Sequence, residues 1–210
     1  MQKLIEGVHQ FRTEELGTYR ELFARLASGG QEPHTFFITC SDSRVLAELI
    51  TNSKPGDLFV VKNVGNIVPP ATVTGSTNST AAAIEFAVEV LRVSDIVVCG
   101  HSQCGAMSVL MRGVDHREAM PHLCSWLELA LPVRETIEQK YPHLACDEDR
   151  VTAAAEENTL FALENLRTYP AVQARIEDGS LHLHAWFFKI ATAELFAFDP
   201  STKQFAPLVK

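Results

Sequence analysis

Two short clusters of residues in this sequence could bind a metal ion. Cys40 opens the first cluster, Cys-Ser-Asp-Ser-Arg, and His101 and Cys104 belong to the second, His-Ser-Gln-Cys-Gly. Each cluster directly follows an apolar run that is typical of a buried strand, and the carboxyl ends of parallel strands meet at one edge of a sheet. Two thiols and one imidazole form a ligand set that zinc favours, with a fourth position open to water. The sequence therefore predicts a catalytic zinc site.

The local context separates these three ligands from the other cysteines. Because His101 and Cys104 are three residues apart, we expect them on one face at the mouth of a helix, with Gly105 where the backbone must come close. Burial for packing alone is the ordinary interpretation of a cysteine. We apply it to the three remaining thiols, Cys99, Cys124 and Cys146. Five cysteines are an odd number, which favours free thiols and a metal site over a disulfide framework.

A carboxylate and a guanidinium follow the first ligand. Asp42 and Arg44 are two residues apart, so in a turn or an extended segment they project to the same side and can form a bidentate pair. A surface ion pair is the ordinary interpretation of such neighbours. Beside a metal, however, the carboxylate could accept a hydrogen bond from metal-bound hydroxide and direct its free lone pair at an electrophile. Because two thiolates donate more charge than three imidazoles, we expect activity to rise towards alkaline pH.

The elements that must position these residues alternate along the chain. We expect strands and helices in the following order: an N-terminal helix, strands at residues 35–39 and 58–62, a helix at 77–91, a strand at 95–99, helices from about 103, at 126–140 and at 151–166, a strand at 180–188 and a hairpin through 195–198. This alternation indicates an α/β fold with a mainly parallel central sheet and flanking helices. A chain of 210 residues suits a single domain over residues 1–210.

The N-terminal segment predicts an amphipathic helical arm over residues 1–28, ended by Gly29 and Gly30. Its apolar residues recur at roughly helical spacing: Leu4, Val8, Phe11, Leu16, Tyr19, Leu22, Phe23 and Leu26. Two interpretations of this arm remain open at this point. The arm either lies across a partner subunit or packs on its own domain.

The composition excludes several classes of partner. The chain has 18 basic and 26 acidic residues and no cluster of Lys and Arg with interleaved aromatic residues, so we expect no nucleic-acid partner. The N-terminal segment lacks the apolar core of a signal peptide, and no run approaches the roughly 18 apolar residues that a bilayer requires. We therefore expect a soluble, cytoplasmic protein that does not bind membranes.

Longer segments around the two clusters closely resemble the β-class carbonic anhydrases, in particular bacterial and cyanobacterial members. The matching segments are the clusters themselves, Pro-Gly-Asp-Leu-Phe-Val-Val-Lys-Asn-Val-Gly-Asn-Ile-Val-Pro-Pro at residues 55–70, and Glu-Phe-Ala-Val at residues 85–88. The resemblance covers most of the chain. It implies the α/β fold of this family and one zinc ion per subunit. It also implies reversible hydration of carbon dioxide to bicarbonate and a proton by zinc-bound hydroxide. It also implies a homodimer or a higher oligomer, in the cytoplasm or in a carboxysome-type compartment.

The resemblance also implies a role for each candidate residue. It makes Cys40, His101 and Cys104 the zinc ligands and makes Asp42 and Arg44 the catalytic dyad. The implied substrate-binding groups are Gln31, Phe59, Val64, Phe86 and the backbone amide of Gly105. In this family some pocket walls come from the neighbouring subunit, so a dimer would be the working unit. The sequence does not identify the proton carrier, for which the surface candidates are His34, His116 and His122.

The chain departs from the family pattern at two places. Many relatives carry glycines where this chain has Asn78 and Ser79, whose side chains could narrow or polarise the edge of the pocket. Some members also bind bicarbonate at an effector site of Trp, Arg and Tyr, which favours a closed form with the aspartate on zinc. The matching positions here are Phe37, Lys62 and Phe188. Loss of the guanidinium and the hydroxyl argues against that effector site, so we expect an open form in which the dyad stays paired.

Three rival functions remain open on the sequence alone. A serine esterase would use residues 100–104 as a nucleophile elbow, with Ser102 as nucleophile and His182 or His184 as base, although such an elbow needs glycine where Cys104 stands. A zinc-binding scaffold on the same fold would have an altered or inactive site because Asn78 and Ser79 replace the glycines of many relatives. Finally, hydroxide could attack a sulfur analogue of carbon dioxide.

Overall fold

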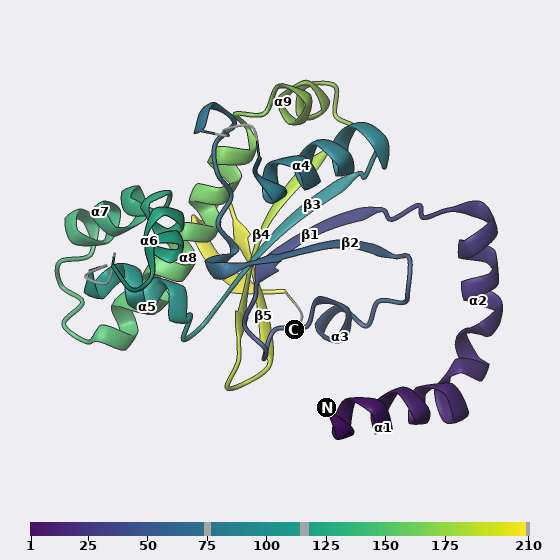
Figure 1. Ribbon diagram of the computed structural model, residues 1–210. Coiled ribbons are helices and arrows are strands. Elements are labelled where there is room, and N and C mark those ends of the chain that lie inside the picture. The colour runs from purple at the N-terminus through teal and green to yellow at the C-terminus, as the bar shows by residue number, and fades with distance from the viewer. Residues whose placement is uncertain (74–76, 114–117, 209–210) are drawn as a thin grey trace.

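The structure is a computed structural model that describes residues 1–73, 77–113 and 118–208 (Figure 1). Its centre is a six-stranded sheet with the strand order β2-β1-β3-β4-β5-β6. The strands are β1 (Thr35–Cys40), β2 (Leu58–Asn63), β3 (Asp95–His101), β4 (His182–Lys189), β5 (Glu194–Asp199) and β6 (Gln204–Pro207). The first four strands pair in parallel, and β5 and β6 add an antiparallel edge. The predicted α/β class and mainly parallel sheet are confirmed, whereas β6 was not predicted.

Helices surround this sheet on both faces. The described helices are α1 (Gln2–Gln10), the π-helical η1 (Phe11–Glu15), α2 (Leu16–Gly29), α3 (Ala47–Thr51), α4 (Ser79–Glu85), the π-helical η4 (Phe86–Val90), α5 (Gly105–Arg112), α6 (Pro121–Glu128), α7 (Leu131–Lys140), α8 (Asp147–Leu166) and α9 (Pro170–Glu177), with short 3-10 turns η2 (Val64–Asn66) and η3 (Ala71–Val73). None of them is long and apolar enough to cross a membrane, within the part of the chain that the structure describes.

Two prolines stand at the starts of helices that the sequence analysis did not separate or did not predict. The helix expected at residues 126–140 is two helices, because Pro132 lies in the first turn of α7 and cannot donate the backbone bond that would continue α6. Helix α9 was not predicted, and Pro170 is its first residue. Proline is favoured in the first turn of a helix for the same reason, since the missing N–H would have no partner there.

The two faces of the sheet are covered unequally. One face packs against α4, η4, α8 and α9 around a core that includes Phe36, Ile38 and Ile96. The other face, which includes Phe37 and Val97, contacts the short helix α3, and several of its apolar side chains are only half buried. The strands at the centre are buried on both faces, which explains their continuous apolar runs.

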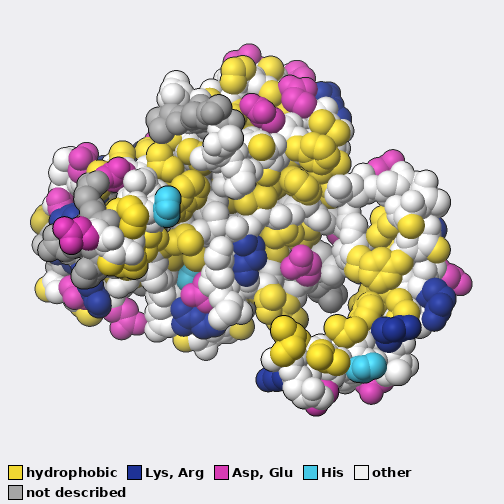
Figure 2. Space-filling view, viewed as in Figure 1, with side chains coloured by type: hydrophobic (Ala, Val, Ile, Leu, Met, Phe, Trp, Pro, Cys, Tyr) yellow, Lys and Arg dark blue, Asp and Glu magenta, His cyan; other side chains and the backbone are white. Residues whose placement is uncertain are grey.

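The N-terminal arm is helical from Gln2 to Gly29, as predicted, and Gly30 ends it with a φ of 85°. None of its residues is buried, and it projects from the domain (Figure 1). Figure 2 shows hydrophobic side chains gathered along one side of the arm. Its exposed large apolar residues are Met1, Leu4, Ile5, Val8, Phe11 and Phe23. Leu26 near the end of the arm lies against Gly56, but most of the apolar side of the arm does not pack on its own domain.

Gly100 in β3 allows α8 to approach the sheet next to the candidate site. A Cβ atom on Gly100 would collide with Thr159 Oγ1 and would lie 3.0 Å from the carbonyl oxygen of Ala155. The Thr159 hydroxyl already donates to that carbonyl at 2.8 Å and cannot move away without losing the bond. We expect Gly100→Ala to lower the free energy of unfolding by about 1–3 kcal/mol in urea denaturation.

Gly17→Ala is the matched control for this prediction, because a Cβ atom on Gly17 would meet no other atom within 4 Å. Alanine is the better helix former, so this control should not destabilise the protein. An unchanged unfolding free energy in Gly100→Ala would show that α8 does not press on β3 as described.

Candidate functional site

The three predicted metal ligands converge at the carboxyl edge of the parallel strands. Cys40 ends β1, His101 ends β3, and Cys104 immediately precedes α5. Their ligand atoms all lie within 4.8 Å of one another, and all three residues are buried. The expectation that His101 and Cys104 share a helix face is wrong, because β3 extends through His101. A short turn joins the two ligands instead, with Gln103 in the left-handed region at a φ of 57°.

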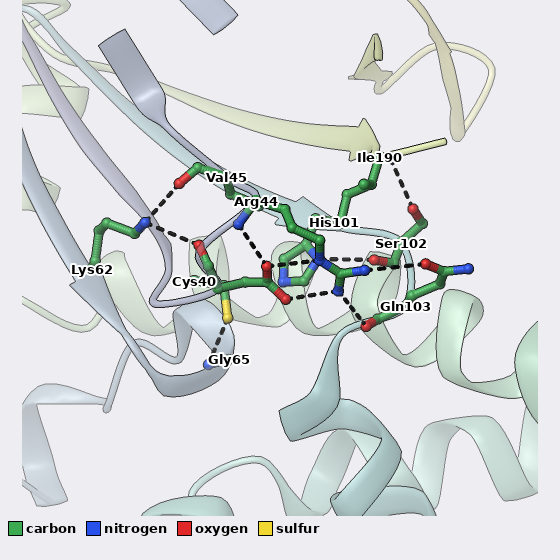
Figure 3. A network of polar contacts seen from close by, with 10 residues as sticks. Cys40, Arg44, Val45, Lys62, Gly65, His101, Ser102, Gln103 and Ile190 are labelled. Carbon is green, nitrogen blue, oxygen red and sulfur yellow. Dashed lines mark hydrogen bonds and ion pairs between the residues drawn. The ribbon is translucent and has the colours of Figure 1, made fainter. Parts of the chain in front are cut away.

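The imidazole of His101 is held in one orientation by the end of β4. Its Nδ1 atom lies 2.9 Å from the carbonyl oxygen of Ser102, and since a carbonyl can only accept, Nδ1 carries the proton (Figure 3). Ser102 is itself fixed, because its amide donates to Phe188 and its hydroxyl accepts from the amide of Ile190. The Nε2 atom of His101 is then an unprotonated, buried acceptor without a hydrogen-bond partner. Such an orphaned nitrogen fits a metal ligand.

The two thiols share a proton and therefore differ in pKa. A hydrogen bond with Cys104 is the largest effect that holds the pKa of Cys40 well below its usual value, and amides of Asp42 and Gly65 add to it. The pKa of Cys104 is raised by the same shared bond and by burial. The Cys40 sulfur therefore ionises more readily than the Cys104 sulfur, and a bound cation would favour the thiolate form of both. Together with the bare Nε2 of His101, this donor set fits zinc.

Asp42 and Arg44 form the predicted bidentate pair. Arg44 Nε donates to Asp42 Oδ1 at 3.0 Å, and a terminal nitrogen donates to Oδ2 at 2.8 Å. The backbone amide of Arg44 also donates to Oδ1 at 2.9 Å. These bonds hold the pKa of Asp42 well below its usual value, so the carboxylate is ionised at neutral pH. Arg44 also donates to the side chain and the carbonyl of Gln103, each at 3.3 Å.

The turn around Gly65 supports the Cys40 sulfur through a second set of contacts. The amide of Gly65 lies 3.4 Å from Cys40 Sγ, and the carbonyl of Gly65 accepts from the buried side chain of Asn158 at 2.9 Å. Gly65 has a φ of 79°, which favours glycine, and a Cβ atom there would lie 2.9 Å from that of Ala106. The indole nitrogen of Trp126 donates to the carbonyl of Val64 at 2.7 Å. Sequence reasoning missed these supports, because no short spacing links α6 and α8 to this turn.

The predicted substrate-binding residues fall into two groups in the structure. Gly105 begins α5 next to Cys104, and Val64 adjoins the Gly65 turn. Gln31 instead lies before the start of β1, at the opposite end from Cys40 of a strand that is about 17 Å long. Phe59 pairs with Phe36 near the same opposite end, and the rings of Phe59 and Phe86 lie 5.8 Å apart. A single chain therefore does not bring the second group to its own metal ligands.

The geometry contradicts a serine esterase. The hydroxyl of Ser102 accepts a hydrogen bond from the amide of Ile190 at the carboxyl end of the parallel strands. His182 lies at the amino end, where it is the register partner of Asp95. His184 is likewise committed, because its Nε2 lies 2.8 Å from a carboxylate oxygen of Asp95. No base from this pair can reach the serine, so a nucleophile elbow is not formed.

Several other sequence expectations can be placed in the structure. Cys99 and Cys124 are buried as predicted, but Cys146 is exposed, so its assignment to core packing was wrong. Asn78 caps α4, with its side-chain oxygen accepting from the amides of Thr80 and Ala81 at 3.0 and 3.1 Å. Among the suggested proton carriers, His34 lies at the amino end of β1, away from the ligands, while His122 is exposed on α6. His116 lies outside the described residues.

Comparisons with known proteins agree on one family. A family model described as carbonic anhydrase matches residues 35–195. A carbonic anhydrase of Synechocystis sp. is 44% identical over 200 residues, which covers 95% of this chain and 71% of that protein. A carbonic anhydrase of Pseudomonas aeruginosa is 38% identical over 210 residues, or 100% of this chain and 93% of that one. The solved β-carbonic anhydrase CcaA superposes with a TM-score of 0.94 at 42% identity, covering 99% of this chain and 98% of that chain.

Proposed function

The chain belongs to the β-carbonic anhydrases, enzymes of reversible carbon dioxide hydration, and we propose that Cys40, His101 and Cys104 hold one zinc ion per subunit for this reaction. The observation that carries the proposal is the convergence of three buried ligand atoms within 4.8 Å, one of them an orphaned imidazole nitrogen. A zinc ion bound there would act as a Lewis acid and lower the pKa of water to about 7. Elemental analysis of the purified protein measures the expected stoichiometry.

Asp42 orients the attacking oxygen in this proposal. Its ionised carboxylate accepts a hydrogen bond from the water-derived nucleophile and so turns a free lone pair towards the carbon of the substrate. Arg44 holds that carboxylate through two parallel hydrogen bonds and keeps it ionised. Because Arg44 occupies both carboxylate oxygens, rotation of the carboxylate is restricted. The pair therefore acts as one positioning unit.

The residues around the ligands place the substrate. The amide of Gly105 is one of the first N–H groups of α5, which have no partner within the helix, and it can donate to an oxygen of carbon dioxide or bicarbonate. Val64 supplies an apolar wall that suits a small, uncharged substrate. Gln31, Phe59 and Phe86 complete the pocket from a second subunit, since they lie at the other end of the sheet in their own chain.

The working unit is a homodimer or a higher oligomer in this proposal. Most of the apolar side of the N-terminal arm is exposed, although Leu26 near its end lies against Gly56, and this exposed side supports its lying across a partner subunit. β-carbonic anhydrases of Sordaria macrospora, similar to this chain with a TM-score of 0.82 at 29% identity over 93% of this chain and 95% of that one, are described as tetrameric. We place the enzyme in the cytoplasm or in a carboxysome-type compartment within it, where thiols stay reduced.

A mixed dimer tests whether Gln31 acts on the partner's site. A subunit with Gln31→Ala keeps its own zinc ligands, and a subunit with Cys104→Ser keeps its Gln31. If the residues act across the interface, every zinc-loaded site of the mixed dimer contains a normal Gln31. Co-expression with two affinity tags should then yield wild-type turnover per zinc ion, whereas the Gln31→Ala homodimer should be slower. Turnover in the mixed dimer as slow as in that homodimer would place Gln31 in its own subunit's site.

A further inference from the structure

The loop at residues 41–46 carries both members of the dyad but is weakly tied to the sheet. The amide of Ser41 donates to Asn63 at 2.8 Å, and the amide of Val45 closes a turn onto the carbonyl of Asp42 at 3.2 Å. The three bonds between Arg44 and Asp42 lie within the loop, so they move with it and cannot fix it relative to the metal ligands. Contacts that reach outside the Asp42–Arg44 pair therefore set the direction of the Asp42 carboxylate. The Asp42 amide bonds to the Cys40 sulfur and Arg44 bonds to Gln103, and a further tie comes from the sheet.

Lys62 supplies such a tie from the edge strand β2. Its register partner in β1 is Thr39, directly before Cys40, so its side chain starts beside the beginning of the loop. The ammonium nitrogen donates to the carbonyl of Val45 at 2.6 Å and to the carbonyl of Asp42 at 3.1 Å (Figure 3). One cation thus spans both ends of the turn that holds Asp42. By comparison, the bonds from Arg44 to Gln103 are both 3.3 Å long.

We propose that Lys62 is a positioning residue that fixes the backbone of Asp42 and thereby aims its carboxylate at the reacting oxygen. This inference rests on the role proposed for Asp42. The carboxylate is separated from its Cα by a single methylene, so a shift of the backbone moves the carboxylate by a similar amount. A displacement of about 1 Å can cost about 100-fold in rate.

The chemistry of the two acceptors explains why an ammonium suits this position. Both are neutral carbonyls, and the ammonium carries three donors arranged tetrahedrally, so it can serve both at once. The side chain of Val45 is fully buried, which makes its carbonyl a firm anchor point. The carbonyl of Asp42 already accepts a hydrogen bond from the Val45 amide, and Lys62 donates a second hydrogen bond to the same oxygen. The side chain of Lys62 thus connects the backbone of Asp42 both to the buried residue Val45 and to β2.

Lys62→Met tests the proposal, because methionine has a similar length but no donor. We expect kcat for carbon dioxide hydration to fall about 10-fold, with KM and the zinc content unchanged. Lys62→Arg keeps a cationic donor and should restore most of the lost kcat. Lys54→Met removes an exposed lysine that precedes the same strand and should leave both constants unchanged. A merely structural role would not produce this separation of kcat from KM.

A double-mutant comparison links the effect to Asp42. If Lys62 acts through the carboxylate, Lys62→Met should cause no further loss in an Asp42→Asn background. An unchanged kcat in Lys62→Met, or an equal loss with and without the Asp42 carboxylate, would overturn the proposal. A rise in KM for bicarbonate in the dehydration direction, at unchanged kcat, would also overturn it, because that pattern belongs to a cation that binds the anion directly. Full activity in Asp42→Asn alone would instead contradict the proposed role of Asp42.

Discussion

Replacement of Cys104 by serine is expected to remove zinc and carbon dioxide hydration together. A serine hydroxyl stays protonated at neutral pH and is a poor zinc ligand, so the site retains one thiolate and one imidazole. The substitution should not unfold the chain, because Cys104 is the N-cap of α5 and serine is a favoured N-cap residue. Zinc per chain should fall from about one to near zero after zinc-replete expression, and the stopped-flow rate should approach the uncatalysed rate.

Cys146→Ser is the control for this loss. Cys146 is an exposed free thiol at the start of α8 and is not part of the cluster of three ligands, so its replacement should leave zinc content and rate unchanged. Stoichiometric zinc with the wild-type rate in Cys104→Ser would remove Cys104 from the metal site. A thermal denaturation curve of each variant separates loss of metal from loss of the fold.

Asp42→Asn is expected to retain zinc and lose at least about 100-fold in turnover. An amide presents one acceptor and one donor where the carboxylate presents two acceptors, so it cannot satisfy both nitrogens of Arg44. The amide nitrogen would face a guanidinium that is also a donor, and the side chain would rotate out of its present position. None of the three ligand atoms is changed, so metal content is the internal reference for this variant.

Stopped-flow hydration rates, expressed per zinc ion, measure this loss. Asp147→Asn makes the same chemical change on the exposed first turn of α8 and should leave the rate per zinc ion at its wild-type value. Full activity in zinc-loaded Asp42→Asn would mean that another group orients the attacking oxygen. Loss of zinc in Asp42→Asn would mean that the carboxylate supports the metal site rather than the reaction.

The periodicity of the sequence was sufficient for the long elements of the fold. Buried parallel strands are continuous apolar runs, and β1, β2 and β3 were predicted to within two residues of their ends. Short elements carry too few residues for a periodic pattern, so α3 and β6 were missed. The boundary between α6 and α7 depends on Pro132. The apolar pattern continues across this proline, so the pattern did not reveal the break.

The sequence by itself determined which groups are candidates for the chemistry. Two thiols, one imidazole and the pair of Asp42 and Arg44 are local motifs that follow two strand ends, and parallel strands bring such ends together. Residue type and short spacing are sufficient for this inference, because the ligands are defined by their atoms and the dyad lies within one loop. The structure confirmed this convergence and the pairing of the dyad.

Only the tertiary structure decided how these groups are held and which of them can share one site. The tautomer of His101 depends on the end of β4, the Cys40 sulfur depends on a turn supported by Asn158, and the loop of Asp42 depends on Lys62. The opposite ends of β1 place Gln31 far from Cys40 in the same chain. These relations join residues from separate elements, and a hydrogen bond of about 3 Å between them requires the three-dimensional arrangement of the backbone, which no spacing along the chain encodes.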